Sequence, residues 1–418
     1  MLIGSFPLYW YSDCMKKYGR ALIILGIVLP AALMADDVSI IKKIRNVSFT
    51  DITHDQVTVQ WTPPAGSNLR YRVWLKDASG NTLAKRRTQQ TSIVLTHLYP
   101  ETKYYIKVRA VQSSHVTGKW SIAQSFTTTA KPPVITNTIF AGDVMLSRYV
   151  ARATEQTGDM AAPFVNIADE FTRNDLAFVN LEAPFQEYGP WDVADDSMTF
   201  KVNPQMMEGL QLAGIDIVSL ANNHVYNAGQ AGVDYTKQYL ADNRIAYCLE
   251  HWDIREVNGL QFAFLCYSYD LNLDIDKLIA DLQEVQNLGA DVIIVSMHNG
   301  TEYTETISPA QSNFAHTAID YGADLVIGHH PHVVQRMEEY QGKYIFYSLG
   351  NLIFDQDWSW PTQLGAVVKV TWEDDQIKKI EFKPVKIDND FQPRFMDFEE
   401  GREVLGRLQV SNYELMVD

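Results

Sequence analysis

The chain has few cysteines, no excess of positive charge and no apolar run long enough for a comfortable membrane span. Three cysteines in 418 residues exclude a disulfide-stapled fold, and none lies in the close pairs of a zinc ribbon or a thiol redox motif. Cys248 and Cys266 are expected to be either ordinary buried thiols or, after export, a disulfide. The formal net charge of -16 argues against a nucleic acid as partner, because neutralising a phosphate backbone requires an excess of Lys and Arg.

Internal repeats and low-complexity tracts are also missing from the sequence. With 46% hydrophobic and 21% charged residues, the composition is that of a folded globular protein. A chain of this length exceeds what one hydrophobic core usually supports, so at least two domains are expected.

The N-terminal segment 1–37 has the order of features found in a secretory signal. A basic stretch, Met15–Arg20, precedes the apolar stretch Ala21–Met34, which ends at the small and acidic residues Ala35-Asp36-Asp37. The residues before Met15 resemble an upstream extension. We therefore expect an exported protein, in the periplasm, on the cell surface or outside the cell. An uncleaved signal anchor, which would hold the protein to the membrane, is the alternative.

Residues 41–130 contain short β-branched and aromatic runs, such as Gln56–Trp61, Tyr71–Leu75 and Tyr104–Val108. Their period-two alternation predicts an antiparallel β-sandwich. The segment Leu98–Tyr104 resembles the corner of a fibronectin type III domain, in which a Tyr hydroxyl bonds back to the upstream backbone. That resemblance implies an all-β fibronectin type III sandwich with a spacing or adhesion role.

A second domain is expected at residues 138–395, after the proline-containing linker 131–137 and before a C-terminal tail, 396–418, with a weak helical pattern. Its apolar strands alternate with helical stretches, which predicts a layered α/β domain. The expected strands are Thr138–Ala141, Leu176–Val179, Ile215–Leu220, Gln261–Cys266, Asp291–Ser296, Asp324–Ile327 and Tyr344–Ser348, closed by Ala366–Trp372 and Ile377–Ile387. The expected helices are Pro204–Leu212, Gly232–Asn243, Ile275–Leu288 and Pro309–Tyr321.

Six of these strands are followed directly by polar residues suited to metal binding. Open α/β sheets place their chemistry at such strand ends. Carboxylates, an amide oxygen and imidazoles form a set of intermediate hardness, which suits one or two divalent ions of Mn, Fe or Zn. A carboxylate that bridged two ions would clamp the oxygens of a phosphoryl displacement. The candidate residues, in chain order, are Asp143, Glu182, Asn223, His224, His298, Glu302, His330, His332 and Asn351.

The motifs that hold these residues resemble those of one family. In order, they are Gly-Asp-Val-Met-Leu from Gly142, Asn-Leu-Glu from Asn180, Ala-Asn-Asn-His from Ala221, His-x-Gly-x-Glu-Tyr from His298, Gly-x-His-Pro-His-Val from Gly328 and Tyr-Ser-Leu-Gly-Asn from Tyr347. Residues 138 to about 390 resemble the CapA family of capsule and poly-γ-glutamate biosynthesis proteins, which is similar in fold to the calcineurin-like metallophosphoesterases.

The resemblance implies a role for each candidate residue. It implies a metallophosphoesterase-like sandwich with Asp143 and His332 on one metal ion. It implies Asn223, His298 and His330 on a second ion, with Glu182 bridging the two. His224 would protonate the leaving oxygen, Glu302 would lie beside the metals or touch substrate, and Asn351 would support the loops.

Two residues depart from the pattern of the resemblance, and two choices rest on local geometry. Met145 stands where phosphoesterases usually carry a His ligand, and a thioether does not replace imidazole on a hard ion. Asn227 stands where CapA-like chains often carry an Asp, so His224 lacks an acidic partner there. Asn223 is preferred over Asn222 as a ligand, although both suit a turn. His329 is expected to point away from the site, because neighbours on a strand alternate faces.

The sequence therefore predicts an exported, metal-dependent, phosphoesterase-like hydrolase of capsule or poly-γ-glutamate synthesis. Its substrate would be a phosphate ester or an anionic envelope polymer, and its partner a capsule synthase complex in the envelope. The alternative is a non-catalytic subunit of polymer assembly or export, or a polymer-binding protein with a vestigial metal site. Trp358 and Trp360, in the loop after Asn351, suit a polymer groove or simple loop packing equally.

Overall fold

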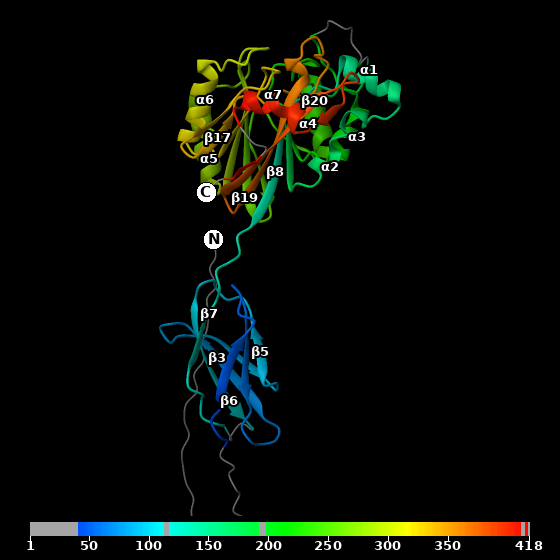
Figure 1. The fold of residues 1–418 in the computed structure, drawn as a ribbon. Coiled ribbons are helices and arrows are strands. Elements are labelled where there is room, and N and C mark those ends of the chain that lie inside the picture. The colour runs from blue at the N-terminus through cyan, green and yellow to red at the C-terminus, as the bar shows by residue number, and fades with distance from the viewer. Residues whose placement is uncertain (1–40, 113–116, 190, 192–197, 411–413, 417–418) are drawn as a thin grey trace, which may run out of the picture. The chain divides into compact units, whose positions relative to one another are not determined.

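The computed structural model describes residues 41–112, 117–189, 191, 198–410 and 414–416 (Figure 1). The chain divides into two compact units, Met1–Lys131 and Pro132–Asp418. The export signal expected in residues 1–37 lies outside the described residues. Among the helices that are described, none combines the length and the apolar character needed to span a bilayer.

The described part of the first unit is an antiparallel sandwich of two sheets, with strand orders β1-β2-β5 and β4-β3-β6-β7. The strands are β1 (Arg45–Thr50), β2 (Val57–Thr62), β3 (Arg70–Lys76), β4 (Thr82–Thr88), β5 (Ser92–Leu95), β6 (Lys103–Val111) and β7 (Gln124–Thr127). Alternation along β2 buries Val57, Val59 and Trp61 between the sheets, as the sequence pattern predicts. The backbone N–H of Tyr99 donates a 2.8 Å hydrogen bond to the hydroxyl of Tyr104, which confirms the predicted tyrosine corner.

The second unit contains two further sheets. One has the order β11-β10-β9-β8-β19-β20-β21, with β18 added to β8 and β22 added to β20. Its strands are β8 (Ile135–Val144), β9 (Leu176–Leu181), β10 (Ile217–Ser219), β11 (Ala246–Cys248), β18 (Asn351–Ile353), β19 (Leu364–Glu373), β20 (Gln376–Ile387), β21 (Pro393–Phe395) and β22 (Glu414–Met416). The other, β12-β13-β14-β15-β17-β16, consists of β12 (Asp253–Val257), β13 (Leu260–Ser268), β14 (Val292–His298), β15 (Leu325–His329), β16 (Met337–Tyr340) and β17 (Lys343–Phe346).

The two sheets of the second unit pack face to face, with helices on both outer sides (Figure 1). Phe178 of the first sheet stacks on Phe264 of the second, with 5.6 Å between ring centroids. On the outer face of the β13-β14-β15 sheet, α5 and α6 bury residues such as Leu282 and Phe314. The helices are α1 (Arg148–Thr157), α2 (Ala168–Phe171), α3 (Met207–Leu212), α4 (Gly229–Asp242), α5 (Ile275–Asn287), α6 (Pro309–Asp320) and α7 (Phe398–Leu408). The result is the layered α/β arrangement that the sequence predicts.

Each predicted strand of the second domain overlaps an observed one, and each predicted helix coincides with a helical segment to within a few residues. At Pro204 the predicted helix begins as a 3₁₀ turn, Pro204–Met206, before α3. The weak helical pattern expected in the tail corresponds to α7. Val404 and Leu405 of this helix are buried in the same core as β19 and β20, so this part of the chain belongs to the packed unit.

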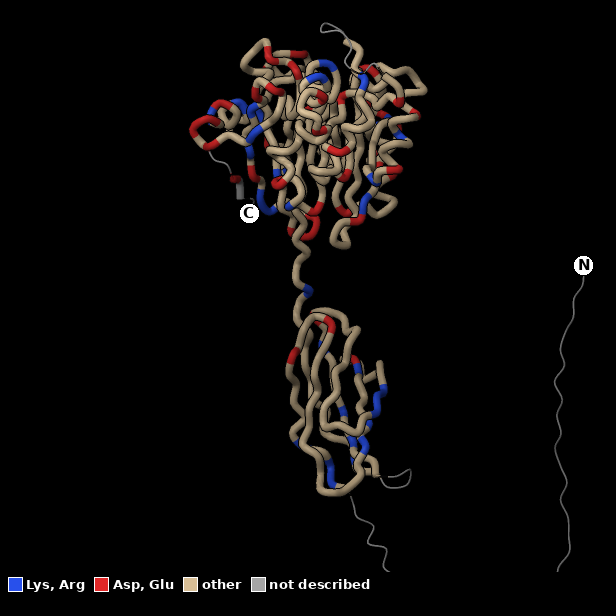
Figure 2. Tube along the Cα trace, turned by 90° about the vertical axis from the view of Figure 1, so that its right-hand side faces the viewer, with Lys and Arg blue, Asp and Glu red and all other residues tan. Residues whose placement is uncertain are grey.

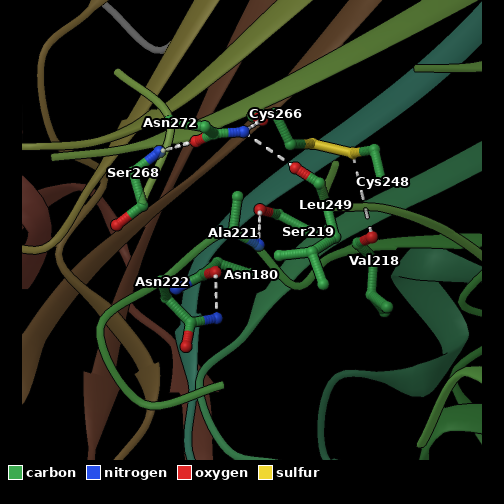
Figure 3. The surroundings of a disulfide bond; sticks show 10 residues. All are labelled: Asn180, Val218, Ser219, Ala221, Asn222, Cys248, Leu249, Cys266, Ser268 and Asn272. Atoms are coloured by element: carbon green, nitrogen blue, oxygen red, sulfur yellow. Dashed lines mark hydrogen bonds between the residues drawn. A yellow bond between two sulfur atoms is a disulfide. The ribbon is translucent and has the colours of Figure 1, made fainter. Parts of the chain in front are cut away.

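A disulfide joins Cys248 to Cys266, so of the two alternatives that the sequence left open, a disulfide or two buried thiols, the structure has the disulfide (Figure 3). Cys248 ends β11 and Cys266 lies in β13, so the bond links an edge of one sheet to the other sheet. Beside it, the Asn272 side chain donates to the carbonyl oxygens of Leu249 and Cys266 at 2.9 and 3.2 Å. The disulfide and this amide together fix the two sheets at the end where β10 and β13 lead into their loops.

Replacing both Cys248 and Cys266 by Ala should lower the free energy of unfolding of the second unit by about 3 kcal/mol. The cross-link closes a loop with a sequence separation of 18, and a loop of this size removes about that much chain entropy from the unfolded state. Urea unfolding of the oxidised protein and the double variant would measure the difference. A loss below about 1 kcal/mol would mean that the disulfide does not hold the two sheets together.

Candidate metal centre

Asp143 reaches the space between the two sheets because β8 contains a bulge. Phe140 pairs with Phe178 on β9, but Asp143 pairs with Asn180, so β8 has one extra residue over this stretch. Because of the bulge, the side chains of Asp143 and Phe140 lie on the same face of β8, the face toward the second sheet. Gly142 sits in the bulge, where a Cβ would overlap the carbonyl oxygen of Gly350. Only glycine allows this close approach of the two backbone segments.

The end of β9 supplies a buried amide and a buried carboxylate on the same face. The Asn180 side-chain amide donates to Oδ1 of Asp143 at 2.8 Å and to Oε2 of Glu182 at 3.3 Å. Asn222 donates in turn to the amide oxygen of Asn180 at 3.2 Å. Asn180 therefore holds the two acids in place, a role that the Asn-Leu-Glu motif contained but that the sequence alone did not reveal.

The loop after β10 brings Asn223 and His224 to the same space. The amide oxygen of Asn223 lies 2.9 Å from Nε2 of His298. Asn222 points back into the core, since its side chain also donates to the Leu181 carbonyl and accepts from the His224 N–H. The geometry thus favours Asn223 over Asn222 as the exposed amide of this loop.

His298 ends β14 on the face of that strand that also carries Ile294, and this face lies against the other sheet. His330 and His332 follow β15 at positive φ angles of 96° and 56°, so the backbone turns sharply and sends both rings into the site. The His298 and His330 ring centroids are 4.7 Å apart. All three histidines are buried.

His329 lies in the site, and the expectation that it points away is wrong. Its Nδ1 is 3.2 Å from Oδ1 of Asp143, and its side chain is fully buried. Strand alternation in β15 puts His329 on the same face as Leu325 and Ile327, which lie between the sheets. The prediction failed because it extended the strand pleat through His330, whereas the strand ends at His329 and a turn replaces the pleat.

One carboxylate oxygen at the centre of this group has no hydrogen-bond partner. Oε1 of Glu182 is buried and unpaired, and it faces the Nε2 atoms of three imidazoles. Those atoms are His332 at 3.6 Å, His298 at 3.9 Å and His224 at 3.9 Å. Such separations are too long for hydrogen bonds but close to those between two ligands of one ion. Nδ1 of His330 is also buried without a partner.

The surroundings shift the pKa values of the two carboxyl groups, Asp143 and Glu182, in opposite directions. Burial alone raises the pKa of Asp143, but contacts with His329 and His332 outweigh it and hold this pKa well below its usual value. Burial, followed by the negative charge of Asp143, raises the pKa of Glu182 well above its usual value. A charged Glu182 therefore needs a nearby cation, and a divalent ion would meet that need.

Two of the candidate ligands, His298 and His330, have imidazoles whose pKa values favour the neutral form. Burial, followed by the charge of His330, lowers the pKa of His298 well below its usual value. Burial, followed by the charge of His332, lowers the pKa of His330 to about 4. Neutral imidazoles keep a lone pair for a metal ion, so the donor set has the chemistry of a transition-metal site.

The ligand atoms fall into two groups, each within 4.8 Å of one another. One group contains Asp143, Glu182 and His298, and the other contains Glu302, His330 and His332. Nδ1 of His332 lies 2.9 Å from the Asn351 amide oxygen, so its Nε2 is left free toward the site. These groups differ from the division that the resemblance implies, because His298 is grouped with Asp143, and His332 with His330. They also add Glu302 to the candidate ligands.

Met145 and Asn227, the two residues that depart from the pattern of the resemblance, make different kinds of contact. The side chain of Met145 is buried and its sulfur accepts a hydrogen bond from the Ser147 N–H, so it is directed at the backbone. Asn227 does supply a partner, because its amide oxygen lies 2.9 Å from Nδ1 of His224. That contact makes Nδ1 the protonated nitrogen of neutral His224 and leaves Nε2 facing Glu182.

A cavity of about 290 Å³ opens beside these residues. His224 and Glu302 line it, together with Arg148, Tyr303 and Trp358. Arg148 forms an ion pair with Asp355, and its guanidinium lies 4.6 Å from the centre of the Phe200 ring, which stacks on His224. Sequence reasoning missed these two charged residues because neither follows a strand end in a recognisable motif.

The aromatic residues of the cavity loop divide into two roles. Trp358 lines the cavity and packs edge-on against Tyr303, with 4.7 Å between ring centroids. Trp360 instead donates its indole N–H to Glu403 at 2.7 Å. Burial raises the pKa of Tyr303 to about 12, so its hydroxyl stays protonated. Of the two tryptophans left open by the sequence, Trp358 is the one placed to touch a ligand.

Comparison with known proteins gives matches to both units. Residues 137–356 match the family described as bacterial capsule synthesis protein PGA_cap, and residues 42–127 match the fibronectin type III domain. The PGA biosynthesis protein CapA of Bacillus subtilis (strain 168) is 30% identical over 271 residues, which cover 59% of this chain and 70% of that protein. The capsule biosynthesis protein CapA of Bacillus anthracis is 27% identical over 273 residues, which cover 59% of this chain and 66% of that protein.

Among solved structures, the fibronectin type III domain of the human KIAA0970 protein is 26% identical and has a TM-score of 0.20, covering 22% of this chain and 75% of that one. The PGA_cap match extends over more than half of the chain and includes every candidate ligand from Asp143 to His332. The chain therefore belongs to the bacterial capsule synthesis protein family PGA_cap, and a fibronectin type III domain precedes its family domain.

Proposed function

We propose that the protein is an exported, metal-dependent hydrolase of the phosphoesterase type that acts on a phosphate ester or an envelope polymer during capsule or polyglutamate synthesis. The observation that carries the proposal is the buried, unpaired Oε1 of Glu182 facing the Nε2 atoms of three imidazoles. A structural role alone would leave this carboxylate oxygen without compensation.

The proposed ligands are six side chains from the ends of five strands, because His330 and His332 both follow β15. Glu182 would bridge two ions, with Asp143 and His332 on one and Asn223, His298 and His330 on the other. Divalent Mn, Fe or Zn bound there would supply Lewis-acid activation of the substrate and of water. Glu302 belongs to the same group of possible ligand atoms as His330 and His332, and its side chain also lines the cavity.

His224 is the proposed proton donor to the leaving group. Its Nδ1 is anchored on Asn227, and its ring stacks on Phe200 at 3.9 Å between centroids. These contacts hold Nε2 toward Glu182 and the cavity. Burial lowers the pKa of His224, which favours release of a proton once the imidazole is charged.

Two observations support an envelope location. The Cys248–Cys266 disulfide is of a kind that persists in oxidising compartments and is rare in a reducing cytosol. The relatives from Bacillus subtilis and Bacillus anthracis are named for PGA and capsule biosynthesis. We propose export to the periplasm, the cell surface or the medium, with a capsule synthase complex as partner.

A second candidate function is a non-catalytic subunit of polymer assembly, or a polymer-binding protein with a reduced metal site. It is favoured by Met145, which occupies the position expected for a His ligand and directs its sulfur to the Ser147 backbone. In that case the site would hold one structural ion or none, and the cavity would bind polymer without cleaving it.

Elemental analysis of the purified, secreted protein tests the two candidates. The hydrolase is expected to contain one or two transition-metal ions per chain and to cleave generic phosphomonoesters or phosphodiesters. His330→Ala should reduce both the metal content and the rate, whereas His316→Ala, on the outer helix α6, should change neither. Stoichiometric metal without any phosphoester hydrolysis would favour the assembly role. Absence of metal in protein prepared without chelators would contradict the metal centre itself.

A further inference from the structure

The fibronectin type III unit is strongly basic, although the whole chain is acidic. Residues 41–131 contain 14 Lys and Arg against 4 Asp and Glu, whereas residues 132–418 contain 18 against 44. Figure 2 shows this contrast, with blue more frequent than red in the first unit and red more frequent in the second. The net charge of -16 therefore conceals a module with the opposite sign, and this module carries a surface that the proposed hydrolase chemistry does not use.

Three arginines lie side by side on the outer face of the β4-β3-β6 strands. Arg72 is in register with Arg87 on β4 and with Arg109 on β6. We call these three residues the arginine row. Neighbouring strands are about 4.8 Å apart, so three positive charges fall on one line across the sheet. Like charges directly opposite one another destabilise a sheet, which makes this register costly unless an anion is bound.

A second row of cations runs parallel to the first. Trp74 is in register with Lys85 on β4 and with Lys107 on β6, and we call these three residues the lysine row. It is two residues away along the strands, or about 7 Å. The Lys85 ammonium lies 5.5 Å from the Trp74 ring centre. Trp74 packs on Trp120 at 4.1 Å between centroids, and Arg109 lies 4.6 Å from the centre of Trp120.

Among the described residues of their own unit, the cations of both rows have no acidic partner. Across residues 41–112 and 117–131, the ion pair that the structure records joins His54 to Asp55, and no Lys or Arg of the two rows pairs with a carboxylate. Nε of Arg109 is buried without a hydrogen-bond partner. Burial, followed by the charge of Arg72, lowers the pKa of Arg109. Lys85 and Arg109 lie over aromatic rings and not beside carboxylates, so a compensating anion does not come from the described part of this unit.

The arginine row also borders a hollow that can receive a ligand. A depression of about 550 Å³ is lined by Arg72 and Arg87 together with Arg70, at the end of the face nearest Val111. The opposite side chains of the same strands, such as Tyr71 and Val108, are buried in the sandwich core. The rows are therefore held on a rigid sheet, and their spacing does not depend on loops.

We propose that the arginine row and the lysine row form a docking surface for an extended polycarboxylate chain of the polyglutamate type. Guanidinium groups match carboxylates through paired N–H donors, and two rows about 7 Å apart suit charges that repeat along an extended polymer. The choice of a polycarboxylate rests on the proposed function, whereas the need for an anion rests on the two rows. The module would hold the polymer near the family domain by binding it, without taking part in hydrolysis.

Binding of the full chain to immobilised poly-γ-glutamate tests the proposal. The unchanged protein should bind with an affinity that falls as NaCl rises, because the contact is electrostatic. The triple variant Arg72→Gln, Arg87→Gln, Arg109→Gln should lose affinity by about tenfold or more, since three charge-assisted contacts are removed. The matched control is Lys42→Gln, Lys43→Gln, Arg45→Gln, which changes the net charge equally, with Arg45 on the other sheet, and should bind within about threefold of the unchanged protein.

Several results would overturn the proposal. Equal losses in the two triple variants would mean that bulk charge, and not the rows, drives binding. Tighter binding to duplex DNA, polyphosphate or anionic lipid vesicles than to poly-γ-glutamate at about 0.15 M NaCl would mean a different partner. Thermal unfolding of each variant checks that the sandwich remains folded. Metal content, measured on the same preparations, separates the two hypotheses, because protein without metal that still binds polymer contradicts only the hydrolase.

Discussion

Glu182→Gln should abolish metal binding while leaving the protein folded. Gln has nearly the shape of Glu, but it removes the negative charge that faces the Nε2 atoms of His224, His298 and His332. Changes to residues that only support ligands typically cost about 10- to 100-fold in metal affinity, so loss of a bridging ligand should exceed about 100-fold. Hydrolytic activity should fall with the metal content. Isothermal titration of the metal-free protein with Mn²⁺ or Zn²⁺ would measure the first effect.

The same substitution should not lower the unfolding temperature of the metal-free protein. Without metal, the carboxylate of Glu182 is buried next to Asp143, and burial with that neighbouring charge raises its pKa. A neutral amide relieves this repulsion, so metal-free Glu182→Gln should unfold at the same temperature as the metal-free parent or at a higher one. Glu256→Gln, an exposed change of equal charge on β12, is the control and should alter neither property. A strongly destabilised Glu182→Gln would assign the residue to the fold and not to a metal.

The positions of the site residues along the chain were predictable because strand ends meet at one edge of a sheet. The apolar runs before Asp143, Glu182 and His298 are long enough to identify each strand, and the parallel pairing of β8, β9 and β10 then collects their exits. Parallel β13, β14 and β15 do the same in the other sheet. That two sheets, and not one, would face each other across the site was not evident from single strand patterns.

The features that sequence reasoning missed depend on backbone irregularities. The bulge in β8 changes which face Asp143 occupies, and nothing in the local pattern marks it except Gly142. His329 was misassigned because the strand ends one residue earlier than the pleat argument assumed. Arg148 has a positive φ of 49° and reaches Asp355 more than 200 residues away, so only the folded structure places this pair at the cavity.

The two cysteines illustrate a different limit. The sequence left two buried thiols and a Cys248–Cys266 disulfide both open. The choice between them becomes evident only in the fold, where the end of β11 in one sheet lies beside β13 of the other sheet. The net charge of the whole chain likewise concealed the basic character of the first unit. A single net charge averages over both units, so it cannot reveal that the basic residues of β3, β4 and β6 share one face.

His224→Gln should lower the turnover rate by about 100- to 10,000-fold while the metal content stays unchanged, which is the range for loss of a general acid. The variant keeps a polar side chain next to Asn227 but has no proton to give to a leaving oxygen. Esters with good leaving groups, such as nitrophenyl phosphodiesters, need little protonation and should lose much less than alkyl esters. His316→Gln on α6, where the ring contacts Glu338 at 3.0 Å, is the matched control and should leave both rates unchanged.

Comparing the losses of rate on the two classes of ester shows whether His224 is a general acid or a metal ligand. Nε2 of His224 is as far from Oε1 of Glu182 as Nε2 of His298 is, at 3.9 Å, so distance alone does not distinguish the two roles. The partners of Nδ1 differ, because the Asn227 amide oxygen accepts from His224, whereas the Asn180 amide nitrogen donates to His298. The neutral amide of Asn227 also stabilises a charged imidazole less than a carboxylate would. Equal losses on both classes of ester, accompanied by loss of bound metal, would make His224 a ligand. Asn227→Asp should then tighten metal binding, whereas for a general acid it should raise the pKa of His224 and move the alkaline limb of the rate profile to higher pH.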